Sequence, residues 1–218
     1  MQTNSISTAK AFRFTGTLSL LLGILTVLTA SRAFAPGHPD FSIFNTYLSE
    51  IGDTPGWPQI LFNSGTLLAA PLRYALIILV VLRLRSMSER KGAFEAIFLT
   101  IGLFSTLGTV VMTAVPFSVA PAIHKSGIGL YFLGVVFLQS MLGVKELKIK
   151  NLPRALPMFS FSIVASFLVF FVLIMLYETG NLDHNTPVFW EWMCFFTSMI
   201  WLAGHSIVMG KEDIEIGL

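Results

Sequence analysis

The sequence is short of charged residues and of cysteine, and each shortage excludes a class of protein. Asp, Glu, Lys and Arg make up 12% of its 218 residues, whereas hydrophobic residues make up 54%. A water-soluble domain carries about 25% charged residues, so this chain has too little polar surface for a soluble globule. Cys194 is the one cysteine, which excludes an intramolecular disulfide and cysteine-based zinc clusters. We therefore predict a membrane protein.

Motifs that identify a reaction are missing as well. The sequence contains no HExxH, GxSxG, paired CxxC or phosphate-cradling glycine loop. The net charge is only +2, and the basic residues are spread over several loops, which argues against nucleic acid as a partner. Composition therefore indicates a class of protein and leaves the activity open.

Six apolar stretches are long enough to cross a bilayer, which takes about 20 residues of helix. None shows the alternating pattern of a barrel strand. The predicted fold is all-α, a polytopic six-transmembrane-helix bundle that fills residues 1–218 as one domain. Ala33-Phe34-Ala35, after the first stretch, resembles a signal-peptidase cleavage site. The apolar run before it is long for a signal peptide, so we expect that the first stretch is not cleaved off. The stretches cover approximately residues 14–30, 60–82, 94–115, 123–142, 158–177 and 187–208.

The distribution of Lys and Arg predicts the orientation, because basic residues are retained on the cytoplasmic side. If the spans alternate in direction, one face holds 11 of the 14 basic residues, and the opposite loops hold Arg32 with several carboxylates. Both termini are therefore predicted to be cytoplasmic. The 11 residues are Lys10, Arg13, Arg83, Arg85, Arg90, Lys91, Lys145, Lys148, Lys150, Arg154 and Lys211.

The first outer loop, residues 31–59, is long and has a helical pattern of its own. Phe41, Phe44, Leu48 and Ile51 follow at spacings of 3, 4 and 3, which is typical of an amphipathic helix. We expect this helix to lie at the membrane interface and to cap the outer end of the bundle. The alternative is a surface loop whose greasy helix rests on its own bundle.

Arg73 is the most prominent polar residue inside a span. It lies about 20 Å along the second stretch at 1.5 Å per residue, directly after Pro71 and on one stripe with Asn63, Thr66 and Ala70. Because side chains lean toward the helix N-terminus, the guanidinium should tilt toward the outer half. An ionisable group in a span is costly, so each one is a functional hypothesis by default.

Other ionisable residues gather at the predicted outer boundary. His124 begins the fourth stretch, Glu191 begins the sixth, and Glu50 and Asp53 precede the second. His205 lies about 21 Å from Glu191 by helical rise, so it cannot share their site. Carboxylates with an imidazole suit acid–base chemistry or a single metal bound by nitrogen and oxygen, although a lone interfacial histidine is more often structural.

Glycines in the fourth stretch leave the question of oligomers open. Gly127 and Gly134 flank the face of His124, and small residues allow close helix packing. This face could pack within the chain or form a homo-oligomer between chains.

Several short segments together resemble the DRAM/Sfk/FGF-receptor-activating-protein family of six-span proteins. Tyr47-Leu48-Ser49-Glu50-Ile51-Gly52-Asp53-Thr54-Pro55 is similar to the family's P-x-I-S-D/E-x-G element, although the opening proline is absent. His124-Lys125-Ser126-Gly127 with Phe132 resembles its H-x-x-G-A…F element, Gln139 its glutamine, and Glu191-Trp192 its E-W pair. A prokaryotic group of six-span proteins with an S-x-x-G…F-N-x-G element also matches, at Ser49, Gly52, Phe62, Asn63 and Gly65.

The resemblance implies a role in lipid biology. Family members are linked to remodelling of glycosylphosphatidylinositol anchors, to phospholipid asymmetry, to recruitment of a phosphoinositide kinase and to autophagy at lysosomes, without a common biochemical activity. It also singles out Ser49, Glu50, His124 and Glu191, the residues that polarity places at the outer boundary.

Two main hypotheses follow for this integral, multi-pass protein. In the first, it binds or organises membrane lipids in an outer polar pocket and needs no cofactor. In the second, it is an intramembrane lipid hydrolase or transferase with His124, Glu191 and Asp53 as catalytic candidates. A zinc cofactor belongs to this second hypothesis alone. A transporter and a pure scaffold are weaker alternatives. The residues expected to bind lipid are Ser49, Glu50, Asn63, Arg73, His124, Glu191 and Trp192.

Overall fold

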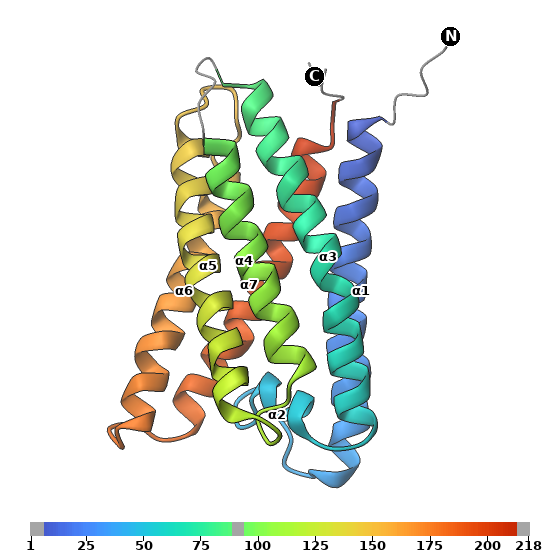
Figure 1. Ribbon diagram of the computed structural model, residues 1–218, viewed down its shortest axis with the longest axis vertical. Coiled ribbons are helices and arrows are strands. Elements are labelled where there is room, and N and C mark those ends of the chain that lie inside the picture. The colour runs from blue at the N-terminus through green and yellow to red at the C-terminus, as the bar shows by residue number, and fades with distance from the viewer. Residues whose placement is uncertain (1–6, 89–93, 213–218) are drawn as a thin grey trace.

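A computed structural model describes residues 7–88 and 94–212, which form a bundle of helices (Figure 1). Six helices are long and apolar enough to cross a membrane, as the sequence predicts, and these two ranges contain no strand. Arg90 and Lys91, counted above among the basic residues, lie outside the described residues. In chain order the elements are α1 (Thr8–Phe34), the 3₁₀ helix η1 (Ala35–Gly37), α2 (Leu48–Asp53), α3 (Trp57–Ser86), α4 (Phe94–Ala114), α5 (Pro121–Leu147), α6 (Ala155–Glu178) and α7 (Asn185–Met209).

Glycine and proline determine how α3 begins and where it is weakened. Gly56 has a φ of 101°, a conformation that favours glycine, and it turns the chain into α3. Pro58 lies in the first turn, where its missing N–H is not needed. Pro71 lies inside α3 and removes one helical hydrogen bond, so the helix is weakened two residues before Arg73.

The six long helices form a closed ring in which each packs against its neighbours in the chain. The ring runs α1, α3, α4, α5, α6 and α7, and α7 packs back against α1 (Figure 1). The end at which α1 begins and α7 ends is here called the terminal end. There Arg13 Nε donates to the Gly210 carbonyl at 3.0 Å. The side of the membrane that this end faces stays a prediction.

The glycine face of α5 packs inside this ring, against α4. A Cβ atom on Gly134 would lie 2.6 Å from the Ser105 Cβ, and one on Gly127 would lie 2.6 Å from the Met112 nitrogen. Both positions therefore need glycine for close helix approach. Gly129 faces open space. Association of two copies of the chain stays a prediction.

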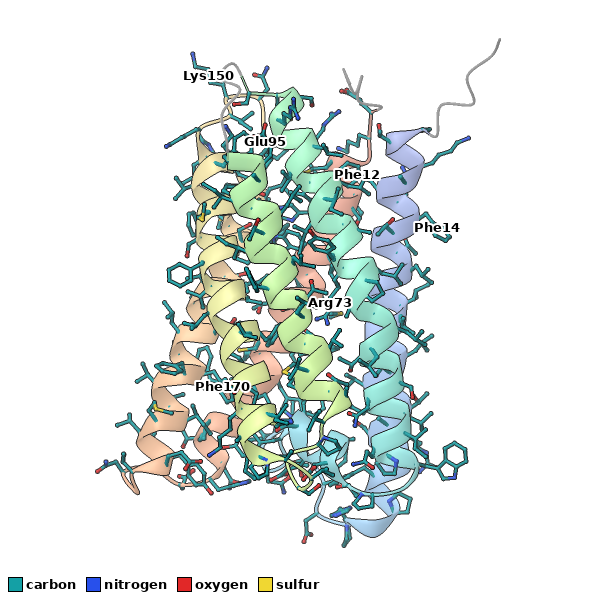
Figure 2. The ribbon with its side chains drawn as sticks, viewed as in Figure 1. Phe12, Phe14, Arg73, Glu95, Lys150 and Phe170 are labelled. Atoms are coloured by element: carbon teal, nitrogen blue, oxygen red, sulfur yellow. The ribbon has the colours of Figure 1, made fainter. Side chains whose placement is uncertain are left out.

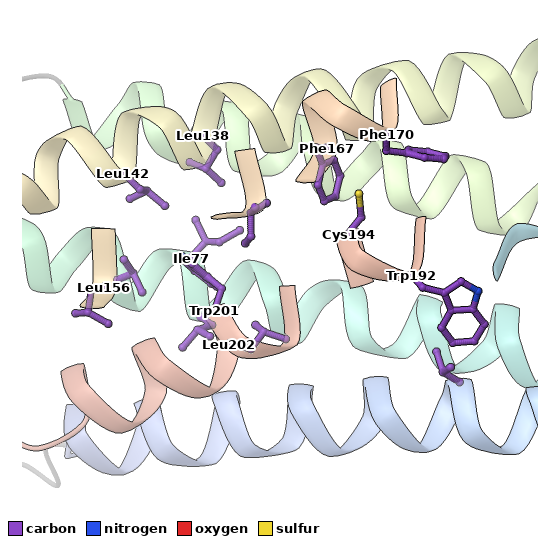
Figure 3. Packing of buried hydrophobic residues seen from close by; sticks show 14 of the residues in the cluster. Ile77, Leu138, Leu142, Leu156, Phe167, Phe170, Trp192, Cys194, Trp201 and Leu202 are labelled. Atoms are coloured by element: carbon purple, nitrogen blue, oxygen red, sulfur yellow. The ribbon is translucent and has the colours of Figure 1, made fainter. Parts of the chain in front are cut away.

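Large apolar side chains fill the interior of the ring. Ile77 of α3, Leu138 of α5, Phe167 of α6 and Trp201 of α7 belong to one buried cluster, which Figure 3 shows from close by. Cys194 belongs to the same cluster as a buried free thiol. This packing fixes α5, α6 and α7 relative to α3.

The opposite end of the bundle, here called the capped end, is covered by the loop between α1 and α3. Its helix α2 is shorter than the sequence pattern suggests, because Phe41 and Phe44 lie in turns before it. The Asn45 side chain accepts from Ser42 N and donates to the Asp40 carbonyl, and such local bonds compete with a helix. This loop with α2, residues 38–56, is called the cap below.

Candidate functional site

Glu191 at the start of α7 fastens the cap to the bundle. Its Oε2 accepts from the Leu48 backbone N–H at 2.5 Å, and Ser49 interacts electrostatically with the same carboxylate. A carboxylate suits these groups because the first N–H groups of α2 have no partner within the helix. Next to it, Trp192 Nε1 donates to the Thr46 carbonyl at 2.9 Å. The Glu191-Trp192 pair thus anchors the cap through its backbone.

Glu50 stabilises the cap from within. Its Oε2 accepts from the Tyr47 N–H at 3.0 Å, and its Oε1 lies 3.4 Å from Nε2 of His184 in the loop before α7. Tyr47 packs edge-on against the same imidazole. Burial of Tyr47, assisted by the negative charge of Glu191, raises the pKa of its phenol above the ordinary value. Tyr47 therefore stays a neutral hydrogen-bonding group near physiological pH.

Asn63 and Asp53 connect the cap to two further elements. Asn63 Nδ2, on α3, donates to the Gly52 carbonyl at 3.1 Å. Asp53 Oδ1 accepts from the Ser118 hydroxyl at 2.8 Å and from its N–H at 3.2 Å. Because Ser118 lies in the loop between α4 and α5, Asp53 holds the cap against that side of the ring.

His124 is held by the same α4–α5 loop, away from the carboxylates. Its Nδ1 lies 2.8 Å from the Val115 carbonyl, to which this nitrogen donates, and its ring packs edge-on against Phe117. Lys125 Nζ lies 5.6 Å from the centroid of the Phe117 ring. The bond to Val115 fixes the imidazole as a support for the loop.

Arg73 lies midway along the bundle, between α3 and α4 in the view of Figure 2. Its guanidinium lies near the Tyr131 hydroxyl of α5 and interacts with it electrostatically. The ion pairs of the described residues join other groups, so no carboxylate in this part of the chain lies within 4.0 Å of Arg73. A guanidinium has five N–H donors, and Arg73 is only partly buried. Most of its donors are therefore available to an anion.

The predicted outer pocket is thus divided among separate contacts. Ser49, Glu50, Asn63, Glu191 and Trp192 belong to the attachment of the cap, whereas His124 contacts the α4–α5 loop and Arg73 contacts Tyr131. No group of three His, Cys, Asp or Glu residues among the described residues is placed to hold a metal ion. What the residues share is a position around the capped end and the space below it.

A second polar cluster, at the terminal end, was missed by sequence reasoning. Glu146 Oε1 of α5 lies 2.7 Å from His205 Nε2 of α7, and both side chains are fully buried. Ser160 of α6 donates to Glu146 Oε2 at 3.1 Å and accepts from Trp201 Nε1 at 3.0 Å. The sequence feature that could have indicated this cluster is the spacing of Glu146, which follows Gln139 by seven residues and so lies on the same helical face.

Comparison with protein families gave one match. The model of the Frag1/DRAM/Sfk1/Cwh43P N-terminal domain family covers residues 11–204, which is most of the chain and includes α3 to α6 and most of α1 and α7. Comparison with curated proteins and with solved structures gave no match.

Proposed function

The chain belongs to the Frag1/DRAM/Sfk1/Cwh43P N-terminal domain family of multi-pass membrane proteins, and from this premise we propose that it binds a membrane lipid through Arg73. The cation would hold the phosphate of a lipid headgroup below the cap, in the half of the membrane that the cap faces. The cap residues, with Glu191 as their main anchor, would close the site toward water. The protein would thus bind or organise lipids rather than convert them.

The observation that carries this proposal is the incomplete pairing of Arg73. A guanidinium inside the membrane is costly unless it finds an anion or reaches water. The group that interacts with Arg73 on α5 is the uncharged Tyr131 hydroxyl, and no ion pair of the described residues includes Arg73. Arginine binds phosphate with two parallel hydrogen bonds. A lipid phosphate would therefore satisfy both the charge and the remaining donors.

The cap contributes to the proposal by covering the end of the ring above Arg73. Its bonds to α7, α3 and the α4–α5 loop cover the end of the ring. A ligand would then approach Arg73 from within the bilayer, where only a lipid is available. In the alternative, a hydrolase or transferase, His124, Asp53 and Glu191 would have to act together, and each has a different partner here.

The test is stabilisation by lipid of the detergent-purified protein. Dioleoylphosphatidylcholine should raise the unfolding temperature of the wild type, because a ligand that binds only the folded state stabilises it. Dioleoylglycerol, which lacks the phosphate, should have little effect. Arg73→Leu should lose the response to phosphatidylcholine, whereas Lys125→Leu, which removes an exposed cation, should keep it. Equal responses of both variants would contradict the proposal.

A further inference from the structure

A shallow groove lies on the outer surface of the ring between α4 and α5, near the terminal end. Its volume is about 350 Å³ and its accessible lining is almost entirely apolar. The position is far from the cap, and none of the residues discussed above as a lipid site contributes to it. The lining residues are Phe98, Ser140, Met141, Val144, Lys145 and Lys148.

Two lysines lie at the end of this groove, and one of them is held in place. Lys145 Nζ donates to the Ser88 hydroxyl at 2.7 Å and lies 4.0 Å from the centroid of the Phe94 ring. Lys148 follows three residues later and is exposed, so both lie on one side of α5. Because the accessible lining is almost entirely apolar, both lysines line the groove beside Met141 and Val144 through their hydrocarbon stems.

No carboxylate of residues 7–88 or 94–212 forms an ion pair with either lysine. Glu146, between them in sequence, faces the ring interior and pairs with His205 at 2.7 Å. Glu95 on α4 pairs with Arg85 at 3.5 Å. Within the described residues, the groove thus combines an apolar floor with an unneutralised positive end.

We propose that this groove binds one anionic glycerophospholipid of the leaflet at the terminal end. An acyl chain lies along Phe98, Met141 and Val144, and the anionic headgroup contacts Lys145 and Lys148. Basic residues at a membrane surface attract anionic headgroups, and the contacts of Lys145 with Ser88 and Phe94 reduce the cost of ordering its side chain. The site is independent of Arg73 and lies at the opposite end from the cap.

Native mass spectrometry of the full chain tests the proposal. The detergent-solubilised protein is titrated with dioleoylphosphatidylglycerol or with dioleoylphosphatidylcholine, and the dissociation constant of the first bound lipid is measured. The wild type should bind phosphatidylglycerol on the order of tenfold more tightly. Lys145→Gln with Lys148→Gln should remove this preference. Lys10→Gln with Lys211→Gln, which removes the same charge from exposed positions at the same end, should keep it.

A second variant tests the groove itself without changing charge. Val144 is 46% exposed, so Val144→Trp fills the groove with little effect on folding and should weaken phosphatidylglycerol binding severalfold. Equal binding of phosphatidylglycerol and phosphatidylcholine by the wild type would overturn the proposal. An equal loss of the phosphatidylglycerol preference in the Lys10/Lys211 control would also overturn it, because it would indicate diffuse electrostatic attraction. The outcome does not depend on Arg73, whose test uses a zwitterionic lipid.

Discussion

Glu146 of α5 and His205 of α7 face each other inside the ring, with 2.7 Å between Oε1 and Nε2. The His205 Nδ1 lies 3.0 Å from the Trp201 carbonyl and donates to it, so Nε2 and Glu146 share a proton between them. Ser160 completes the shell of the carboxyl group. Each polar group is therefore paired, and three helices are joined at this point.

Removal of one partner of this pair should be severe. Glu146→Ala leaves His205 Nε2 and the Ser160 O–H without their buried partner, which costs about 3–5 kcal/mol. The loss is measured as a fall in the free energy of unfolding in detergent. Lys148→Gln, on the exposed side of α5, should change it by less than about 0.5 kcal/mol.

The double variant Glu146→Leu with His205→Leu separates charge pairing from packing. Replacing a buried ion pair by apolar residues is often neutral, so the double variant should be more stable than Glu146→Leu or His205→Leu alone. A double variant that loses the sum of these two single effects would show that the pair does not couple α5 to α7.

Glu191 should control the stability of the cap rather than that of the ring. Glu191→Ala leaves the Leu48 N–H without its acceptor, and a hydrogen bond to a charged group contributes about 1.5–3 kcal/mol. Amide hydrogen exchange in residues 46–53 should accelerate by roughly ten- to a hundredfold. Unchanged exchange in the cap would show that other contacts hold it.

The control for Glu191 is Glu178→Ala at the end of α6. Glu178 is exposed and also lies at the capped end, so it reports the effect of lost charge alone. Exchange in residues 46–53 should remain at the wild-type rate in this variant.

Two glycines of α5 offer a matched test of helix packing. Gly134→Ala places a methyl group against Ser105, where a Cβ would lie 2.6 Å away, and should destabilise the protein by about 1–3 kcal/mol. Gly129→Ala meets nothing within 4 Å and should be neutral or stabilising by up to about 1 kcal/mol. The two unfolding free energies are compared in the same detergent, and equal values would rule out close α4–α5 packing at Gly134.

The spans could be predicted from the sequence because hydrophobicity is a local property. The cap residues could be singled out as candidate site residues because polar groups at a membrane boundary are costly. The sequence could not assign their partners. Glu191 bonds to Leu48, a residue 143 positions earlier, and helical spacing says which face a residue lies on but not what that face contacts. The residues expected in the outer pocket have separate partners in the structure, and the pocket itself stays a prediction.

Glu146 was missed for a related reason. It lies between Lys145 and Lys148, where the sequence reads as the start of a basic loop, whereas α5 continues to Leu147. Its burial depends on Ser160, Trp201 and His205, which come from two other helices. The partnership with Tyr131 that defines Arg73 likewise exists only in the folded ring.

The measurement that tests the central claim most directly is mass spectrometry of the lipids and metals that co-purify with the protein in nanodiscs. Wild type and Arg73→Leu are compared, with Lys125→Leu as the control for charge. The account predicts a defined phospholipid in the wild type and in Lys125→Leu that Arg73→Leu loses. The same lipids in all three samples would contradict lipid binding through Arg73.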